Sequence, residues 1–257
     1  MPLSCPRIYV CGRLAIEHPA GVLLERDFPA RQGRRFWAYL VLNRQQPVSR
    51  GDLAEAVWGD DVPDAWGTSL NAIASRLRRL TVPFDAPDAP FAISGEPGRY
   101  RLVLPEGAFV DHERARAAIH DADRCHAAGR HEESLAEARV ALEIAARGFL
   151  PGEEGPWVTA TRDALASIRL RAQERTVEAE LARGRPEWAE AEAEALIALD
   201  PLRESGYRLL MRALAASGNR AQVEWVHRRC RDALLHGAGI APSARTDALY
   251  SELVGGA

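Results

Sequence analysis

Three breaks in the C-terminal half of the chain resemble one another, and they limit the possible folds more than any other feature. They read AAGRHEESLAEA (127–138), LARGRPEWAEAEA (181–193) and AASGNRAQVEWV (215–226), and each places a glycine within a run rich in alanine. Gly184 and Gly218 lie 34 residues apart, which is the period of a tetratricopeptide repeat. The pattern predicts stacked helix pairs, because one pair cannot bury its apolar face alone.

The predicted array of helices is irregular at its start. Strand patterns end near residue 106, and RGFLPGEEGPW (147–157) predicts an inserted loop, followed by a long helix over about 157–183. A closing helix is expected over 243–254. We therefore predict that residues 107–257 form an all-α, tetratricopeptide-like domain of roughly three helix pairs and a closing helix.

The N-terminal half has a different pattern. Strands are predicted over 7–17 and 21–28, helices over 31–47, 48–59 and 68–81, and two more strands over 91–104 around an EPG turn. Ser49 is expected to cap the second helix, with Asp52 three residues later and Gly59 at its end. This order is typical of a winged helix-turn-helix, so residues 1–106 are predicted to form an α+β domain of that class.

Charge is distributed unevenly in this half. The whole chain carries a net charge of -3, yet residues 28–51 hold five arginines and no acid, and residues 65–84 hold three arginines and no acid. Such segregation creates a local positive field that the total charge conceals. All 33 basic residues are arginine, which coding bias explains without any function.

The segment TSLNAIASRLRRL (68–80) is the predicted recognition helix. On a helical wheel one side is apolar, comprising Leu70, Ile73, Ala74, Leu77 and Leu80. The opposite side carries Thr68, Asn71, Ala72, Ser75 and Arg79, flanked by Arg76 and Arg78. Arginine pairs with guanine and asparagine with adenine, and a solvated helix face ordinarily mixes charges of both signs. The acid-free face therefore favours contact with DNA.

Further arginines are predicted to contact DNA. Two lie on the hairpin and four in the first acid-free stretch. Together with the helix residues they make up the predicted site: Thr68, Asn71, Ser75, Arg76, Arg78, Arg79, Arg99, Arg101, Arg31, Arg34, Arg35 and Arg50. Arg76 and Arg78, at the margins of the helix face, are expected to grip phosphate rather than bases.

These residues carry a family resemblance. The strand pair, RQGRRFWAYLVLNRQQPVSRGDLAEAVWG, LNAIASRLRRL, GRYRL and the helical repeat with LDPLRE resemble the SARP-type bacterial regulators, over residues 7–254. That family joins an OmpR-like winged helix to a bacterial transcriptional activator domain. The resemblance implies a transcriptional activator that binds double-stranded promoter DNA, often as a dimer on direct repeats, and contacts RNA polymerase. Arg99 stands where the family usually has glycine, and the insertion FLPGEEGPW departs from its shorter link.

Other classes of function remain open as alternatives. The acidic helical half allows a protein-interaction scaffold whose winged helix does not read DNA, and a pocket near the 147–157 loop would suit an enzyme or a ligand sensor. The cluster of His112, His120, His126 and His131 with Cys125 has no known metal spacing. Without lysine the chain lacks a Walker-type phosphate loop, and it has no GxSxG elbow. We expect no enzyme activity, cofactor or metal.

The N-terminus and the cysteines indicate the compartment. The first residues lack the basic start and unbroken apolar core of a signal peptide, and no apolar run reaches the length of a membrane span. Cys5, Cys11, Cys125 and Cys230 show neither a paired ladder nor a zinc spacing, so they are expected to be reduced. We expect a cytoplasmic, nucleoid-associated protein without membrane contact.

Overall fold

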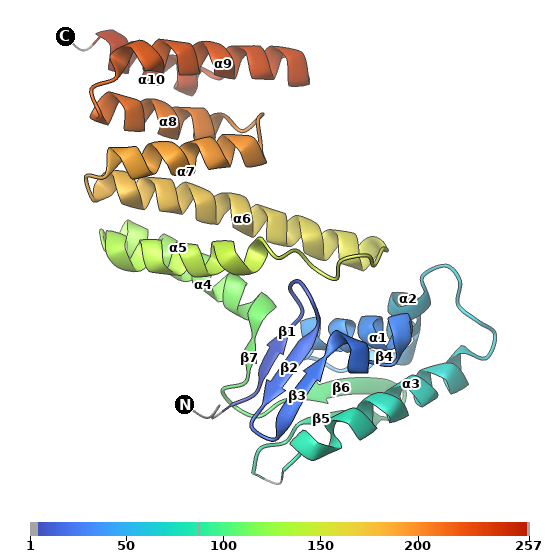
Figure 1. The fold of residues 1–257 in the computed structure, drawn as a ribbon. Coiled ribbons are helices and arrows are strands. Elements are labelled where there is room, and N and C mark those ends of the chain that lie inside the picture. The colour runs from blue at the N-terminus through green and yellow to red at the C-terminus, as the bar shows by residue number, and fades with distance from the viewer. Residues whose placement is uncertain (1–4, 87, 256–257) are drawn as a thin grey trace. The chain divides into compact units, whose positions relative to one another are not determined.

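The computed structural model describes residues 5–86 and 88–255. The chain divides into two compact units, drawn in Figure 1. Unit 1 comprises Met1–Arg114 and Arg147–Leu165, and unit 2 comprises Ala115–Ala146 and Ala166–Ala257. Unit 1 thus includes the 147–157 loop, which a division at residue 106 assigns to the C-terminal half. The fold is mostly helical and has a small N-terminal sheet region, which agrees with the expected α+β part followed by helices.

Unit 1 opens with a four-stranded sheet in the order β3-β2-β1-β7. Its strands are β1 (Arg7–Tyr9), β2 (Ala15–His18), β3 (Gly21–Leu24) and β7 (Phe109–Val110). The single strand predicted over 7–17 is wrong, because the chain turns at Gly12, with φ +80°, and forms an antiparallel hairpin. Asp111 holds this turn by accepting hydrogen bonds from the N–H groups of Val10 (3.0 Å) and Cys11 (2.9 Å). The sequence also misses β7, which is too short to show a strand period.

In the described residues of unit 1, three helices and a second sheet lie between β3 and β7. They are α1 (Ala30–Leu42), α2 (Arg50–Trp58), α3 (Trp66–Thr81), and the strands β4 (Val48–Ser49), β6 (Arg99–Val103) and β5 (Ala92–Glu96), with 3-10 turns at Glu25–Asp27 and Val82–Phe84. The helix predicted over 31–47 ends early, because Asn43 leaves the helical conformation and its amide donates to the Tyr39 carbonyl (2.8 Å). As predicted, Ser49 caps α2 by accepting from the N–H of Asp52 (3.1 Å).

An aromatic core holds these elements together. Trp37 is fully buried and stacks on Phe91, with ring centroids 6.1 Å apart. Phe36 on α1 meets Tyr100 on β6 edge to face at 5.5 Å. Leu70 of α3 is fully buried with them, so the apolar side of α3 is fixed toward the core. The opposite side of α3 is left at the surface.

In the part of the chain that the structure describes, seven helices follow β7. They are α4 (Asp111–Ala127), α5 (His131–Ala145), α6 (Pro156–Ala182), α7 (Pro186–Leu199), α8 (Glu204–Ala216), α9 (Arg220–Ala238) and α10 (Ala244–Gly255). The three predicted breaks are confirmed, with Gly129, Gly184 and Gly218 at φ +72°, +68° and +81°. In unit 2, α7 packs on α8 and α8 on α9 (Figure 1). The buried core between them includes Tyr207 and Met211.

The cysteines and the hydropathy of the helices are two further features of the described residues. All four cysteines are free, and Cys11, Cys125 and Cys230 are buried. Among the described residues, none of the helices combines the length and the hydropathy that crossing a membrane requires.

Candidate nucleic-acid interface

The surface of α3 has the division that its sequence predicts. Leu70, Ala74 and Leu77 are at most 1% exposed. The exposed side chains are Thr68, Asn71, Ala72, Ser75, Arg76 and Arg79. The exposed face therefore presents hydrogen-bonding and cationic groups, with a single methyl group and no carboxylate from α3.

Asn71 is held by the hairpin of β5 and β6. The hydroxyl of Tyr100 on β6 donates a hydrogen bond to Asn71 Oδ1 over 2.8 Å. Tyr100 itself is 5% exposed and is fixed by its contact with Phe36. Because its oxygen is engaged, the Asn71 amide is oriented to offer its two Nδ2 hydrogens.

Arg78 binds the hairpin with its guanidinium group. Its Nε donates to the Ile93 carbonyl on β5 (2.8 Å), and its guanidinium lies over the Tyr100 ring at 5.8 Å. A Cβ at Gly95 would come within 2.8 Å of Arg78 Nη2, so a glycine on β5 makes room for this contact. The structure thus places Arg78 between α3 and the hairpin, whereas its sequence position suggested phosphate.

The hairpin presents two further arginines. Arg99 and Arg101 are exposed and alternate along β6 with the buried Tyr100 and Leu102, as the period of a strand requires. The turn between the strands uses Gly98, at φ +76°. Within the described part of the chain, neither guanidinium group forms a hydrogen bond or an ion pair.

Arg50, at the start of α2, is partly engaged. Its Nη2 donates to the Gly67 carbonyl (2.9 Å) and its guanidinium lies over the Trp66 ring at 5.9 Å. Its backbone N–H donates to Gly98 O (3.1 Å), which joins α2 to the hairpin turn. Arg79 Nη1 donates to Ser75 Oγ one turn earlier on α3 (3.2 Å), so these two predicted site residues lie side by side.

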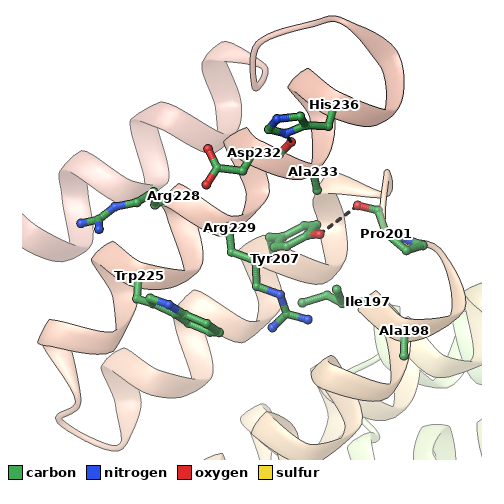
Figure 2. Close-up of a pocket in the computed structure, with 10 residues that line it drawn as sticks. All are labelled: Ile197, Ala198, Pro201, Tyr207, Trp225, Arg228, Arg229, Asp232, Ala233 and His236. Atoms are coloured by element: carbon green, nitrogen blue, oxygen red, sulfur yellow. Dashed lines mark hydrogen bonds between the residues drawn. The ribbon is translucent and has the colours of Figure 1, made fainter.

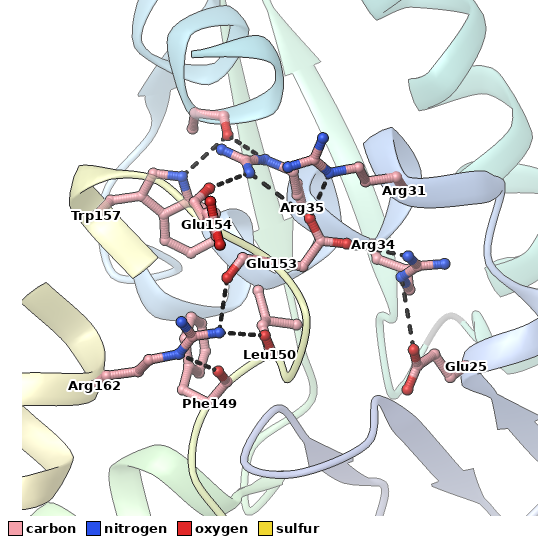
Figure 3. A network of polar contacts seen from close by, with 11 residues as sticks. Glu25, Arg31, Arg34, Arg35, Phe149, Leu150, Glu153, Glu154, Trp157 and Arg162 are labelled. Atoms are coloured by element: carbon pink, nitrogen blue, oxygen red, sulfur yellow. Dashed lines mark hydrogen bonds and ion pairs between the residues drawn. The ribbon is translucent and has the colours of Figure 1, made fainter. Parts of the chain in front are cut away.

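Arg31, Arg34 and Arg35 converge instead on Glu153, as Figure 3 shows. Glu153 Oε2 accepts from Arg31 (2.8 Å), Oε1 accepts from Arg34 (3.0 Å), and Arg35 Nη1 lies 3.7 Å from Oε2. The side chain of Glu153 is 4% exposed, and so is that of Arg35. Three of the five arginines in the first acid-free stretch therefore have their counter-charge in the loop after α5.

Other hydrogen bonds of that network hold the loop against α2 and against the first turns of α6. Trp157 Nε1 and Arg35 Nε both donate to the Ala56 carbonyl, over 3.0 and 2.9 Å. Arg162 donates to the carbonyls of Phe149, Leu150 and Glu153 (Figure 3). The sequence pattern did not predict this role of Glu153. The available indication was the GEEG segment, which supplies two carboxylates to a loop while α1 has three unbalanced arginines.

Two of the hollows among the described residues bear on function. One, of about 350 Å³, lies in unit 1 beside Trp157, where the sequence suggested a pocket near the 147–157 loop. The other, of about 660 Å³, lies in unit 2 between the end of α7 and α9, with Tyr207, Trp225 and Arg229 in its wall (Figure 2). Arg229 lies over the rings of both aromatic residues, at 5.9 and 5.5 Å.

The histidines do not assemble a metal site in the described residues. His126 and His131 meet edge to face with centroids 5.6 Å apart, and His126 Nε2 lies 3.9 Å from Glu178. Across residues 5–86 and 88–255, no three histidine, cysteine or acidic side chains are grouped closely enough to hold an ion.

A helical array joined to a unit with two small sheets and an arginine-bearing helix and hairpin is typical of a transcriptional regulator. Comparison with known proteins agrees with this class. Residues 110–254 match the family model described as the bacterial transcriptional activator domain. The chain belongs to that family, and it is a SARP-type regulator.

Individual relatives are regulatory proteins. Regulatory protein AfsR of Streptomyces coelicolor is 31% identical over 212 residues, which cover 82% of this chain and 20% of AfsR. Transcriptional regulatory protein EmbR of Mycobacterium tuberculosis is 30% identical over 227 residues, which cover 86% of this chain and 57% of EmbR. The structure of M. tuberculosis EmbR in complex with a low affinity phosphopeptide matches with a TM-score of 0.83 and 26% identity, over 98% of this chain and 65% of that one. The chain thus spans only part of these relatives.

Proposed function

We propose that this chain is a sequence-specific, DNA-binding transcriptional regulator, and an activator, that acts in the cytoplasm on promoter DNA. In this proposal residues 1–106 form a winged helix-turn-helix in which α3 enters the major groove and the β5–β6 hairpin is the wing. Residues 107–257 form the tetratricopeptide-like domain that contacts RNA polymerase. The family and its regulatory relatives support the class, and the residues of α3 support the contact with DNA.

The observation that carries the proposal is the exposed face of α3 and its link to the hairpin. Five polar or cationic side chains lie on that face without a carboxylate of α3, and Tyr100 and Arg78 attach the helix to β6 and β5. A reading helix must be held rigidly, because discrimination between bases depends on donor positions within a fraction of an ångström.

We assign proposed roles to the predicted site residues from their contacts within the chain. We propose that Thr68, Asn71, Ser75 and Arg79 face bases, and that Arg76, Arg99 and Arg101 bind phosphate. Arg50 and Arg78 are positioning residues within the winged helix. Arg31, Arg34 and Arg35 are engaged by Glu153 and are left out of the proposed interface.

Fluorescence anisotropy with DNA from upstream of the gene, across a salt series, tests the proposal. Each neutralised phosphate releases counterion, so we expect binding that weakens steeply with salt and exceeds the binding of random DNA. Absence of binding at low salt would sink the proposal.

Arg79→Ala tests the reading of bases. If Arg79 pairs with guanine, discrimination at one base pair should fall by about 1–3 kcal/mol. Arg116→Ala, an exposed arginine on α4, is the matched control and should leave discrimination unchanged. An equal loss on specific and random DNA would assign Arg79 to phosphate instead.

The hollow in unit 2 keeps a second candidate function open, a scaffold that binds protein and does not read DNA. Trp225 is 55% exposed at its edge, and exposed tryptophans are common in protein interfaces. Chromatin immunoprecipitation with sequencing separates the two functions, because a scaffold yields no enriched DNA motif.

A further inference from the structure

The hollow of about 350 Å³ in unit 1 is bounded by two walls. One wall is α2 with the turn that follows it, and the other is α1 with residues 154–157 of the loop. The loop is fixed by the Glu153 network and by the hydrogen bond from Trp157 to Ala56, so this wall is built into unit 1 (Figure 3). The hollow is therefore a preformed site rather than a gap beside a loose loop.

Carboxylates dominate the charge of this hollow. Five line it, four on the α2 side and one on the loop: Asp52, Glu55, Asp60, Asp61 and Glu154. In the described part of the chain none of their side-chain oxygens forms a hydrogen bond or an ion pair. Two arginines, Arg31 and Arg35, belong to the lining and share the carboxylate of Glu153 with a third, so the lining holds five carboxylates against two guanidinium groups. The field inside the hollow is consequently negative, and a cation would be drawn into it.

Three aromatic side chains supply the apolar part of the lining, which a simple acidic surface lacks. Tyr39, Trp58 and Trp157 line the hollow, and Tyr39 meets Trp157 edge to face with centroids 5.3 Å apart. Burial raises the pKa of Tyr39, and the charges of Asp52 and Glu55 raise it further, so its hydroxyl stays neutral. Aromatic rings attract organic cations through their faces and pack against alkyl chains.

We propose that this hollow binds a small organic cation, an aliphatic diamine or polyamine. One ammonium group would meet the carboxylates of α2 and the turn after it, and a second would meet Glu154, while the alkyl chain lies against the tryptophans. A metal ion would gain nothing from contact with the aromatic lining, and a volume of about 350 Å³ is larger than a single ion occupies.

Occupancy of this site would act on the start of α3. Asp60 and Asp61 belong to the segment that joins α2 to α3, so a cation that binds them restrains the chain just before the helix proposed to read DNA. Binding itself does not depend on the proposed DNA contacts, so the two proposals can fail separately.

Isothermal titration calorimetry with spermidine and with putrescine, on the full chain without DNA, tests the inference. We expect saturable binding at one site, together with a change in tryptophan fluorescence. The double substitution Asp60→Asn with Asp61→Asn should weaken spermidine binding by about tenfold or more, because charge-assisted hydrogen bonds are lost. Both residues are exposed, and the thermal melt of this variant should match the parent.

Asp64→Asn with Asp88→Asn is the matched control. Both aspartates are exposed and lie outside the lining, and their substitution removes the same amount of charge. It should leave the affinity unchanged. No saturable binding, or an equal loss in the control, would overturn the inference. Binding of magnesium alone with spermidine unable to compete would overturn it as well, because the site would then be one for an inorganic ion.

Discussion

Asn71 and Tyr100 show how one buried hydroxyl orients a side chain that faces solvent. Tyr100 is fixed by the core of unit 1, and its hydroxyl engages the oxygen of the Asn71 amide. An asparagine used to recognise adenine both accepts and donates. With its oxygen engaged, Asn71 is better suited to donate to a base acceptor.

Tyr100→Phe tests this role at the scale of a single residue. The ring keeps its packing on Phe36, and only the hydroxyl is lost, so the thermal melt should change little. Discrimination at the base pair facing Asn71 should fall by about 1 kcal/mol, while affinity for random DNA stays the same. Anisotropy titrations against single-base variants of the site provide the measurement. A uniform loss on all sequences would mean that Tyr100 does not position Asn71.

Glu153 acts at the scale of an element, because it holds the 147–157 loop against α1. Three arginines depend on its carboxylate, and Arg35 is as deeply buried as Glu153 itself. Burial lowers the pKa of the Arg35 guanidinium, and the charge of Glu153 opposes that shift. Removal of this carboxylate would leave a buried cation without its partner.

Glu153→Gln should therefore destabilise unit 1 by about 3 kcal/mol. Urea denaturation followed by tryptophan fluorescence provides the measurement, and limited proteolysis should cut the loop sooner. The neighbouring substitution Glu154→Gln is the control, since its carboxylate is exposed and unpaired among the described residues. Equal stability of the two variants would contradict the role given to Glu153.

Glu174 joins two elements of unit 2. Burial raises its pKa, but hydrogen bonds from Arg203 and Ser205 outweigh burial, so the pKa lies below the usual value of 4.5. Arg203 donates from Nε and Nη2 over 2.8 and 3.1 Å, which links α6 to the start of α8. A depressed carboxylate pKa stabilises the fold above the unfolded pKa, and this stabilisation is lost as the pH falls through the folded value.

Glu174→Gln should accordingly lower the free energy of unfolding by about 2 kcal/mol at neutral pH. The difference from the parent should shrink as the pH falls below 4.5, since the parent then loses the same interaction. Chemical denaturation at several pH values measures both effects. A difference that stays constant down to low pH would show that the charge of Glu174 is not the cause.

At the scale of the whole molecule, the net charge of -3 says little about partners. Acidic residues of one segment neutralise arginines of another, as Glu153 does for α1, whereas Arg76, Arg99 and Arg101 are exposed without a described partner. The unpaired arginines determine the field that DNA would meet.

The double substitution Arg76→Ala with Arg99→Ala tests whether these unpaired arginines contact DNA. It should change the stability of the fold little, because both side chains are exposed. If each contacts one phosphate, the slope of log affinity against log salt should become shallower by about two. The control Arg116→Ala with Arg228→Ala removes the same charge from α4 and α9 and should leave the slope unchanged. Equal slopes in both variants would mean that long-range charge, rather than contact, is responsible.

Periodicity and turn residues in the sequence determined the order of the helices in both units, the cap of α2 by Ser49, the hairpin around Gly98 and the glycine breaks of the helical array. These features depend on local interactions within a few residues, which a sequence displays directly. The division of α3 into a buried and an exposed side followed for the same reason.

Only the tertiary structure decided which arginines are free. Glu153 lies more than a hundred positions from Arg31, and Arg78 reaches a carbonyl on the hairpin rather than solvent. A local pattern also could not reveal β7, because its two residues pair with β1, which lies far earlier in the chain. Partners distant along the chain are chosen by packing and by the need to satisfy buried charge, and neither leaves a period in the sequence.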